Sequence, residues 1–291
     1  MDILHTLDIA SWDVPISSAT QASACDALES GRVLFFPDLV FPLRDGERVL
    51  FSPQISDGKS KNISLKPSGE MGGTTCPGEQ AQLLKDMMER FARTASQFLG
   101  SLIPAYAHRL ERAPTSYRPV EIAGRPQSAI HDDTRLHVDA FPSRPMRGRR
   151  ILRLFSNINP AGAPRVWHVG EPFEEVAQRF LPGTRAGSRA QSWMMGALGI
   201  TKGTRSPYDW LMLGLHDRAK LDDDYQRSSP QSEIPFPAGS AWICFTDQVM
   251  HAALAGQYVL EQTFHLDVDA MAAPSRAPLR VLERLTGRPL V

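Results

Sequence analysis

Short segments rich in β-branched and aromatic residues follow one another after Pro114, separated by Pro, Gly and Asn turn residues. This composition is typical of β-strands, whereas a helix would show apolar residues at three-and-four spacing. The segments lie at residues 135–141, 150–158, 164–169, 239–245 and 262–268. A helix predicted at 171–180 interrupts them, and the pattern as a whole predicts a β-barrel or β-sandwich core.

Helical spacing dominates the region before these segments. From Pro77, which suits a first helical turn, apolar residues recur three and four apart as far as Leu102, which predicts one long amphipathic helix. Further upstream, the apolar run 31–43 has strand character that two prolines break. We therefore expect a single domain of the α+β class, mainly β, over residues 1–291. Its expected parts are N-terminal strands and the long helix at about 1–114, a β core at about 115–270 and a C-terminal tail at 271–291.

Charge and composition exclude several classes of partner. The chain has 32 Lys and Arg against 32 Asp and Glu, so no overall field would attract nucleic acid. No stretch approaches the roughly 18 apolar residues of a membrane span, and the first residues carry acids where a signal peptide carries bases. Cys25, Cys76 and Cys244 are odd in number and far apart, which argues against a disulfide framework. We expect a cytoplasmic protein.

His137 and Asp139 form a His-x-Asp motif in one strand-like segment, and His251 follows a later Gly-Ser-x-Trp segment. Side chains two apart on a strand share a face, so His137 and Asp139 can bind one ion. Two imidazoles and one carboxylate leave three positions of an octahedron open, as non-haem iron(II) oxygenases require, whereas a closed four-ligand zinc site leaves none. A structural, hydrogen-bonded role for these residues is the alternative.

The order of strands and ligands decides between these two interpretations. It matches the double-stranded β-helix (jelly-roll, cupin-like) core of the 2-oxoglutarate oxygenases, in which two ligands come early and the third comes near the end of the barrel. We therefore expect such a core with flanking helices. The expected cofactor is Fe(II), with 2-oxoglutarate and O2 as co-substrates.

Three other histidines compete for a place in the site. His131 is followed by Asp132 and Asp133, and is either part of a turn near the metal or a surface residue. His216 is a further candidate in a Gly-Leu-His-Asp sequence. His265 lies in a strand-like segment and either lines the barrel interior or is a hydrogen-bonded core histidine.

The second carboxylate of 2-oxoglutarate needs a cation, and the planar fork of Arg suits it best. Many oxygenases of this superfamily carry that Arg shortly after the last His, but residues 262–266 hold none. We therefore expect Arg153 or Arg165 to bind this carboxylate, with Thr263 as a further co-substrate residue. A buried Arg is costly unless it is paired, which favours Arg153, while a surface-facing strand Arg is the alternative.

Two further segments have two interpretations each. Residues 204–226 mix aromatic, basic and acidic side chains and predict a loop with a short helix, either a lid over the substrate or a solvated connection. Residues 275–291 place apolar side chains beside arginines. This pattern predicts either a helix packed on the barrel or one that rests on an anionic membrane.

Longer motifs point to one family. Residues 132–145 (DDTRLHVDAFPSRP), 149–160 (RRILRLFSNINP) and 165–174 (RVWHVGEPFE) together resemble the 3-deoxy-D-manno-oct-2-ulosonic acid (Kdo) hydroxylases. The likeness extends to residues 27–39, 116–125 and 245–254, and so covers most of the chain.

This resemblance implies a bacterial Fe(II)- and 2-oxoglutarate-dependent dioxygenase that hydroxylates Kdo at its 3-position and releases succinate and CO2. It implies a Kdo-containing lipid A or lipopolysaccharide precursor as partner, met at the cytoplasmic face of the inner membrane. The metal-ligand role carries over to His137, Asp139 and His251. Ile130 and His131 stand where the family leads us to expect basic residues, which leaves the substrate range open.

Four arginines flank the metal motif and are candidates for binding an acidic sugar, namely Arg135, Arg144, Arg147 and Arg149. Two other functions remain as alternatives. One is a 2-oxoglutarate oxygenase that acts on another small molecule. The other is a non-catalytic β-barrel that binds a sugar or lipid.

Overall fold

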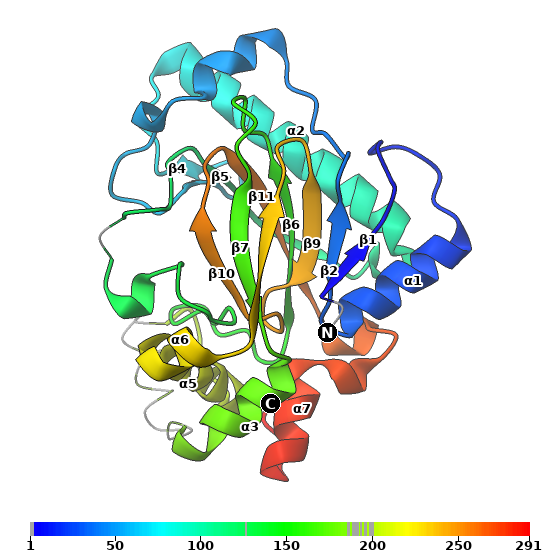
Figure 1. Cartoon of the computed structure of the whole chain (residues 1–291), viewed down its shortest axis with the longest axis vertical. Helices are drawn as coiled ribbons and strands as arrows, with labels where there is room; N and C mark the ends of the chain where they lie inside the picture. The colour runs from blue at the N-terminus through cyan, green and yellow to red at the C-terminus, as the bar shows by residue number, and fades with distance from the viewer. Residues whose placement is uncertain are drawn as a thin grey trace.

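Two β-sheets form the centre of the protein (Figure 1). The structure, a computed structural model, describes residues 3–125, 127–184 and 201–291, together with Gly187, Ser192, Met194 and Ala197. The larger sheet has the strand order β1-β2-β9-β6-β11-β5-β3-β4, and the smaller one has the order β10-β7-β8. β1 and β2 are parallel, and the other described pairs are antiparallel. The strands are β1 (Leu4–Thr6), β2 (Val33–Phe36), β3 (Ile63–Leu65), β4 (Met71–Gly72), β5 (Glu111–Arg118), β6 (Arg150–Asn157), β7 (Arg165–Gly170), β8 (Gln231–Phe236), β9 (Ala241–Phe245), β10 (His251–Ala255) and β11 (Val259–Leu266).

An aromatic core fills the space between the two sheets. Trp242 and Cys244 of β9 point into this space, while the residues that alternate with them pack on the opposite face of the large sheet. The ring of Trp242 stacks on Phe236 of the small sheet, with centroids 4.1 Å apart. β9 is therefore buried on both faces, which explains its continuous apolar sequence.

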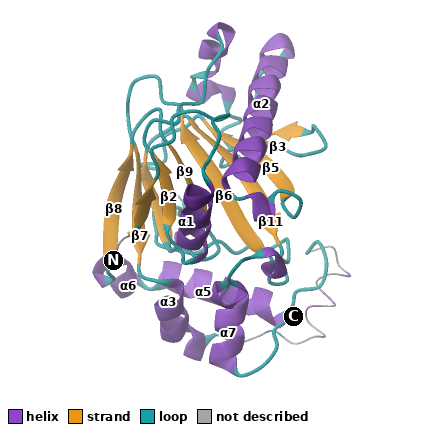
Figure 2. Ribbon diagram, turned by 90° about the vertical axis from the view of Figure 1, so that its right-hand side faces the viewer, coloured by secondary structure: helices purple, strands orange, loops and turns teal. Residues whose placement is uncertain are grey.

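Helix α2 (Gly78–Leu102) covers the outer face of the large sheet and confirms the predicted long helix. Figure 2 shows it on the side away from β7 and β8. A shorter helix, α1 (Ser18–Glu29), is not predicted from the sequence, because its apolar residues do not form one stripe. Its first turn is fixed by Ser17, whose side chain accepts a hydrogen bond from the backbone N–H of Thr20.

Further helices gather at one end of the sheets, at the bottom of Figure 1: α3 (Phe173–Phe180), α5 (Pro207–Leu221), α6 (Asp223–Ser228) and α7 (Pro278–Thr286). α3 confirms the helix predicted at 171–180, and α5 with α6 make the segment 204–226 more helical than expected. α7 buries Leu279 and Leu282 and pairs Arg284 with Glu174 of α3 at 2.9 Å. Packing on the protein therefore accounts for the amphipathic pattern of its sequence.

Four of the five predicted strand segments correspond to β6, β7, β9 and β11. The fifth prediction is wrong, because residues 135–141 form no strand. Only His137 makes an isolated bridge, with His251, so the motif lies beside β10 without joining a ladder. Helices hold more of the described residues than strands do, so "mainly β" applies to the core of this α+β fold rather than to the whole chain.

The cysteines Cys25, Cys76 and Cys244 are free thiols. None of the helices in the described ranges combines the length and the apolar character needed to span a bilayer.

Candidate metal centre

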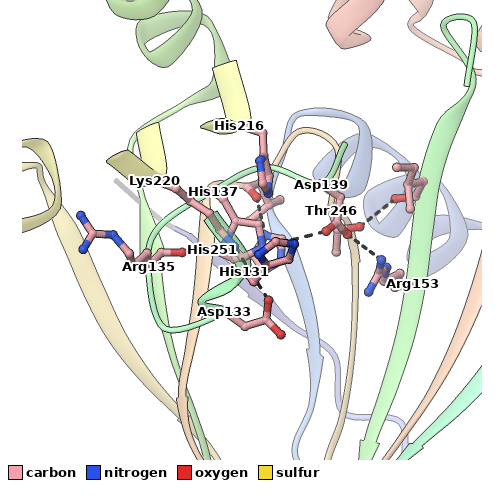
Figure 3. Close-up of polar contacts among 12 residues, drawn as sticks. His131, Asp133, Arg135, His137, Asp139, Arg153, His216, Lys220, Thr246 and His251 are labelled. Atoms are coloured by element: carbon pink, nitrogen blue, oxygen red, sulfur yellow. Dashed lines mark hydrogen bonds and ion pairs between the residues drawn. The ribbon is translucent and has the colours of Figure 1, made fainter. Parts of the chain in front are cut away.

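His137, Asp139 and His251 meet at the end of the sheets that faces α5 (Figure 3). Each offers one ligand atom, and these atoms all lie within 4.8 Å of one another. The backbones of His137 and His251 exchange two hydrogen bonds of 3.0 and 2.9 Å, and the N–H of Asp139 donates to the carbonyl of Thr246 at 2.7 Å. Main-chain pairing therefore fixes the spacing of residues that are more than a hundred positions apart in the chain.

Both imidazoles are oriented by backbone carbonyls. Nδ1 of His137 lies 2.7 Å from the carbonyl of Arg135, and Nδ1 of His251 lies 2.8 Å from that of Val249. A carbonyl only accepts, so each Nδ1 carries the proton and each Nε2 keeps a free lone pair. Such outer hydrogen bonds hold metal-binding histidines in the correct tautomer and orientation.

The protonation states suit metal binding. Burial lowers the pKa of His137 well below its ordinary value, and the nearby His251 adds to this effect. Burial also lowers the pKa of His251, although the charge of Asp139 opposes it. For Asp139, burial alone would raise the pKa, but the charge of Arg153 outweighs this effect and holds the pKa below its usual range. Two neutral imidazoles and one carboxylate result.

A chain of alternating charges supports Asp139. Nη2 of Arg153 lies 2.9 Å from Oδ2 of Asp139, and Nη1 of Arg153 lies 3.0 Å from Oε1 of Glu261. The other carboxylate oxygen of Glu261 lies 2.6 Å from Arg118. Arg153 is largely but not fully buried, with 13% of its side chain exposed, and its charge is already met by two carboxylates. Thr263 also lies here, and its hydroxyl donates to Glu261 at 3.2 Å.

The three residues line a cavity of about 980 Å³. On its wall, Trp167 of β7 stacks on the ring of His251 with centroids 5.1 Å apart. Arg165 lies two residues earlier on the same face of β7 and is only 4% exposed. It donates one hydrogen bond of 2.6 Å, to the carbonyl of Gly256, and has no carboxylate partner among the described residues. Burial lowers its pKa to about 9.

Gly256 makes this position of Arg165 possible. It has a φ of +105°, and a Cβ at this position would lie 2.8 Å from the carbonyl oxygen of Pro164. Both features exclude an ordinary side chain, so β10 and β11 can approach the start of β7 closely only with glycine at their turn.

Comparison with known proteins decides the family. The family model described as 3-deoxy-D-manno-oct-2-ulosonic acid (Kdo) hydroxylase matches residues 11–289. The chain belongs to this family. The predicted resemblance is therefore confirmed.

Solved structures of the Kdo hydroxylase KdoO, a non-haem Fe(II) and 2-oxoglutarate-dependent dioxygenase, are similar over nearly the whole chain. The complex with 2-oxoglutarate and Fe(III) has a TM-score of 0.95 and 47% sequence identity, covering 99% of this chain and 97% of that one. The cobalt(II) complex has a TM-score of 0.97 and 48% identity with the same coverage. These matches confirm the predicted cupin-like fold. No curated protein matches the chain.

Within this Kdo hydroxylase fold, the other histidines take different places. Nδ1–H of His216 in α5 donates a hydrogen bond of 2.8 Å to the carboxylate of Asp217, and its ring meets that of His137 edge-on at 5.4 Å. His131 is exposed at the cavity mouth and hydrogen-bonds through Nδ1 to Ser128 at 2.8 Å, in line with the surface interpretation. His265 is buried and lines the same cavity, in line with the barrel-interior interpretation.

Helix α5 forms part of the cavity wall, to which it contributes Trp210, His216 and Lys220 among others. This placement supports the interpretation of 204–226 as a cover over the substrate. Lys220 is only 1% exposed, and with Lys61 it faces Asp133 across the mouth, at 3.8 and 2.7 Å.

The four arginines that flank the motif do not form one group. Arg135 pairs with Asp223 of α6, and Arg147 donates to the carbonyl of Thr204. Arg149 pairs with two carboxylates on the surface. Of the four, only Arg144 lines the main cavity.

Sequence reasoning missed several residues of the site. Glu261 is the clearest case, because a carboxylate in a strand-like segment with apolar residues on either side, VLEQTFHL, is itself a signal of a paired charge. Trp167 is a large aromatic residue within the strand-like segment PRVWHV, and such a residue indicates a buried packing position. Lys61 and Arg118 give no such signal, because they lie in segments of the chain that are far from the metal-binding motif.

Proposed function

We propose that this chain hydroxylates Kdo as an Fe(II)- and 2-oxoglutarate-dependent dioxygenase, with His137, Asp139 and His251 as the metal ligands. The observation that carries the proposal is the two-imidazole, one-carboxylate donor set at the wall of a large cavity. This set fits Fe(II), since it fills one face of an octahedron and leaves the opposite face open.

The protein's own residues prepare this centre before any ion binds. The carbonyls of Arg135 and Val249 hold the two imidazoles, and Arg153 holds one oxygen of Asp139. When bound, Fe(II) would supply the chemistry that couples oxidative decarboxylation of 2-oxoglutarate to hydroxylation of the sugar, with one oxygen atom of O2 ending in succinate and the other in the new hydroxyl group. The surrounding side chains position the reactants and exclude water.

We assign the distal carboxylate of 2-oxoglutarate to Arg165. A buried cation without a carboxylate partner is costly, and an arriving dicarboxylate would remove that cost. Arg165 lies on the same strand face as Trp167, which contacts His251, so it is placed within the same cavity as the metal ligands. Arg153 and Thr263 remain the other candidates, although Glu261 and Asp139 already engage them.

For the substrate, we propose Kdo attached to a lipid A or lipopolysaccharide precursor, hydroxylated at the 3-position. Cations are frequent in the cavity wall, which includes Lys61, Lys202 and Lys220. They suit a sugar that carries a carboxylate near phosphates.

Mass spectrometry of the lipopolysaccharide inner core tests reaction and site together. Cells with the gene should show one added oxygen on Kdo, and cells that carry Asp139→Ala should not. Asp224→Ala, which changes an exposed aspartate of α6, is the matched control and should keep the added oxygen. If the wild-type chain adds no oxygen to Kdo, the substrate proposal is wrong.

Two assays separate the alternative functions. Succinate release with Kdo-containing lipid, compared with free metabolites, distinguishes Kdo hydroxylation from oxidation of another small molecule. A non-catalytic sugar- or lipid-binding barrel would bind no Fe(II) and would be unaffected by His251→Ala.

A lipid-linked substrate leads us to propose peripheral contact with the cytoplasmic face of the inner membrane. The apolar side of α7 is buried, so such contact would involve exposed arginines of α7 and of the residues that follow it, for example Arg280 and Arg288. Flotation with anionic vesicles should weaken for Arg280→Gln/Arg288→Gln. Equal flotation of this variant and the wild type would exclude α7 as the contact.

A further inference from the structure

Lys220 is a buried cation in the wall of the main cavity. It lies near the end of α5, the residue is only 1% exposed, and its side chain extends toward the metal ligands (Figure 3). Electrostatics agree with this placement. Burial lowers the pKa of His137, and after His251 the charge of Lys220 contributes to that shift. Burial also lowers the pKa of Lys220, and the charges of Asp133 and Asp139 oppose the change.

The contacts of Lys220 leave most of its hydrogen-bonding capacity unused. An ammonium group has three N–H donors. In the part of the chain that the structure describes, the ammonium of Lys220 donates one hydrogen bond, of 3.1 Å, to the carbonyl of Ile130. Its ion-pair partner Asp133 lies 3.8 Å away, and the oxygen concerned already accepts a hydrogen bond of 2.7 Å from Lys61. One carboxylate therefore balances two lysines, and two donors of Lys220 remain available.

The other largely buried cations of the cavity wall are occupied. Arg153 and Arg118 both pair with Glu261, at 3.0 and 2.6 Å. Arg165 is the residue that we assign to the distal carboxylate of 2-oxoglutarate. Within the described ranges, Lys220 is thus the buried cation near the metal ligands that still has donors for a further anion.

The chemistry of Kdo requires such a cation close to the metal. Kdo is a 2-ulosonic acid, so its carboxylate carbon is C1, and C1 and the reacting carbon C3 are both bonded to C2. When C3 faces the metal, the carboxylate must therefore lie at the edge of the metal centre. A cation at the outer end of the cavity would be too far away to reach it, whereas Lys220 lies at the required depth.

We propose that Lys220 binds the carboxylate of the Kdo unit that reacts, and so sets which carbon of the sugar faces the metal. The inference rests on the proposed function, because it assigns the acidic group of the same substrate to one residue. A charge-assisted hydrogen bond between the two groups would offset the cost of burying the ammonium. A sugar with a neutral group in place of the carboxylate would lose this contact, so Lys220 makes the site selective for sugar acids.

Binding of a simple Kdo glycoside tests this assignment without turnover. The full chain, loaded with Co(II) and 2-oxoglutarate in the absence of O2, is titrated by calorimetry with the methyl glycoside of Kdo. A second titration uses the corresponding carboxamide, which has nearly the same shape but no charge. The wild type should bind the carboxylate about tenfold more tightly or better, since a hydrogen bond between charged groups contributes at least that much. Lys220→Gln should bind the two glycosides with nearly equal affinity.

Gln at this position keeps an N–H donor for the carbonyl of Ile130 while it removes the charge. The matched control is Lys59→Gln, which removes the same charge from an exposed position outside the cavity and should keep the wild-type preference. The assignment is overturned if the wild type binds the two glycosides equally or binds neither. It is also overturned if Lys220→Gln keeps the preference for the carboxylate.

A second measurement uses the wild-type protein alone. With Zn(II) in place of Co(II) to keep the protein diamagnetic, the Nζ resonance of Lys220 should shift more with the carboxylate glycoside than with the carboxamide. Equal shifts would contradict the contact. If the wild type adds oxygen to Kdo but shows no preference between the glycosides, the role of Lys220 is wrong and the proposed hydroxylation stands. If Kdo gains no oxygen, the hydroxylation itself is wrong, so the two failures are distinguishable.

Discussion

Arg153 lies 2.9 Å from Asp139 through one nitrogen of its guanidinium group and 3.0 Å from Glu261 through another. The carboxylate that we assign to the metal is thus held by a partly buried arginine, which is itself held by a buried glutamate. The side chain of Glu261 is only 3% exposed, and it also pairs with Arg118, where this chain of charges ends. We therefore regard Glu261 as a positioning residue that acts on the metal centre through Arg153.

Glu261→Gln should weaken metal binding by about tenfold, the lower end of the usual effect of losing an outer partner of a metal site. With the negative charge gone, Arg153 would interact more strongly with Asp139 and make it a poorer ligand. Cobalt(II) titration, followed by visible absorption, measures the affinity directly. Glu233→Gln, at a largely exposed position of β8, is the control. Unchanged cobalt affinity in Glu261→Gln would show that the charge chain does not act on the site.

Arg165→Gln should raise the KM for 2-oxoglutarate at least tenfold, because it removes the buried cation that we assign to the distal carboxylate. Cobalt affinity should stay at the wild-type value, since Arg165 contacts none of the three ligands. Arg125→Gln is a close control. Arg125 also donates to backbone carbonyls nearby, but it does not line the cavity.

Arg153→Gln distinguishes the two arginine candidates. We expect it to weaken cobalt binding, since Arg153 contacts Asp139. The assignment to Arg165 is wrong if Arg153→Gln instead raises the KM for 2-oxoglutarate at constant cobalt affinity, while Arg165→Gln has no effect.

Acid should destabilise the protein partly through His265. Its pKa is lowered to about 4 in the folded state by burial and by the nearby arginines, against roughly 6.5 in the unfolded chain. As pH falls below the unfolded value, the unfolded state takes up the proton first. Stability is then lost at up to about 1.4 kcal/mol per pH unit until the folded pKa is reached.

Urea unfolding of wild type and His265→Gln between pH 7 and pH 4.5 measures this contribution. As the pH is lowered, the free energy of unfolding of the wild type should fall more steeply than that of His265→Gln. Above neutral pH the two proteins should show the same dependence of this free energy on pH. His108→Gln, at an exposed position, serves as control. Parallel curves for wild type and His265→Gln would contradict the prediction.

Trp242→Ala should destabilise the fold by about 3–5 kcal/mol, because Trp242 is fully buried between the two sheets and stacks on Phe236. Trp242→Phe keeps an aromatic ring in the same space and should cost clearly less. Thermal and urea unfolding of the two variants give both values. Equal stability losses would show that the stacked ring is not what holds the sheets together.

Local patterns in the sequence determined much of the fold and the family. The three-and-four spacing from Pro77 to Leu102 predicts α2 because helical period is a property of neighbouring residues, and the longer motifs identify the Kdo hydroxylases. The same local reasoning fails at 135–141, where His137 finds its backbone partner in His251 rather than in a strand ladder. It also misses α1, whose apolar residues form no single stripe.

Only the tertiary structure decided which charges meet. Arg153 and Glu261 are 108 residues apart in the chain, and nothing local to either says that they pair. Their pairing occupies the arginine that the sequence favoured for 2-oxoglutarate and leaves Arg165 as the buried cation without a carboxylate. Likewise, His265 is one strand histidine among several until the fold buries it in the wall of the main cavity. Ion pairing and burial depend on contacts across the sheets, and these exist only once the chain has folded.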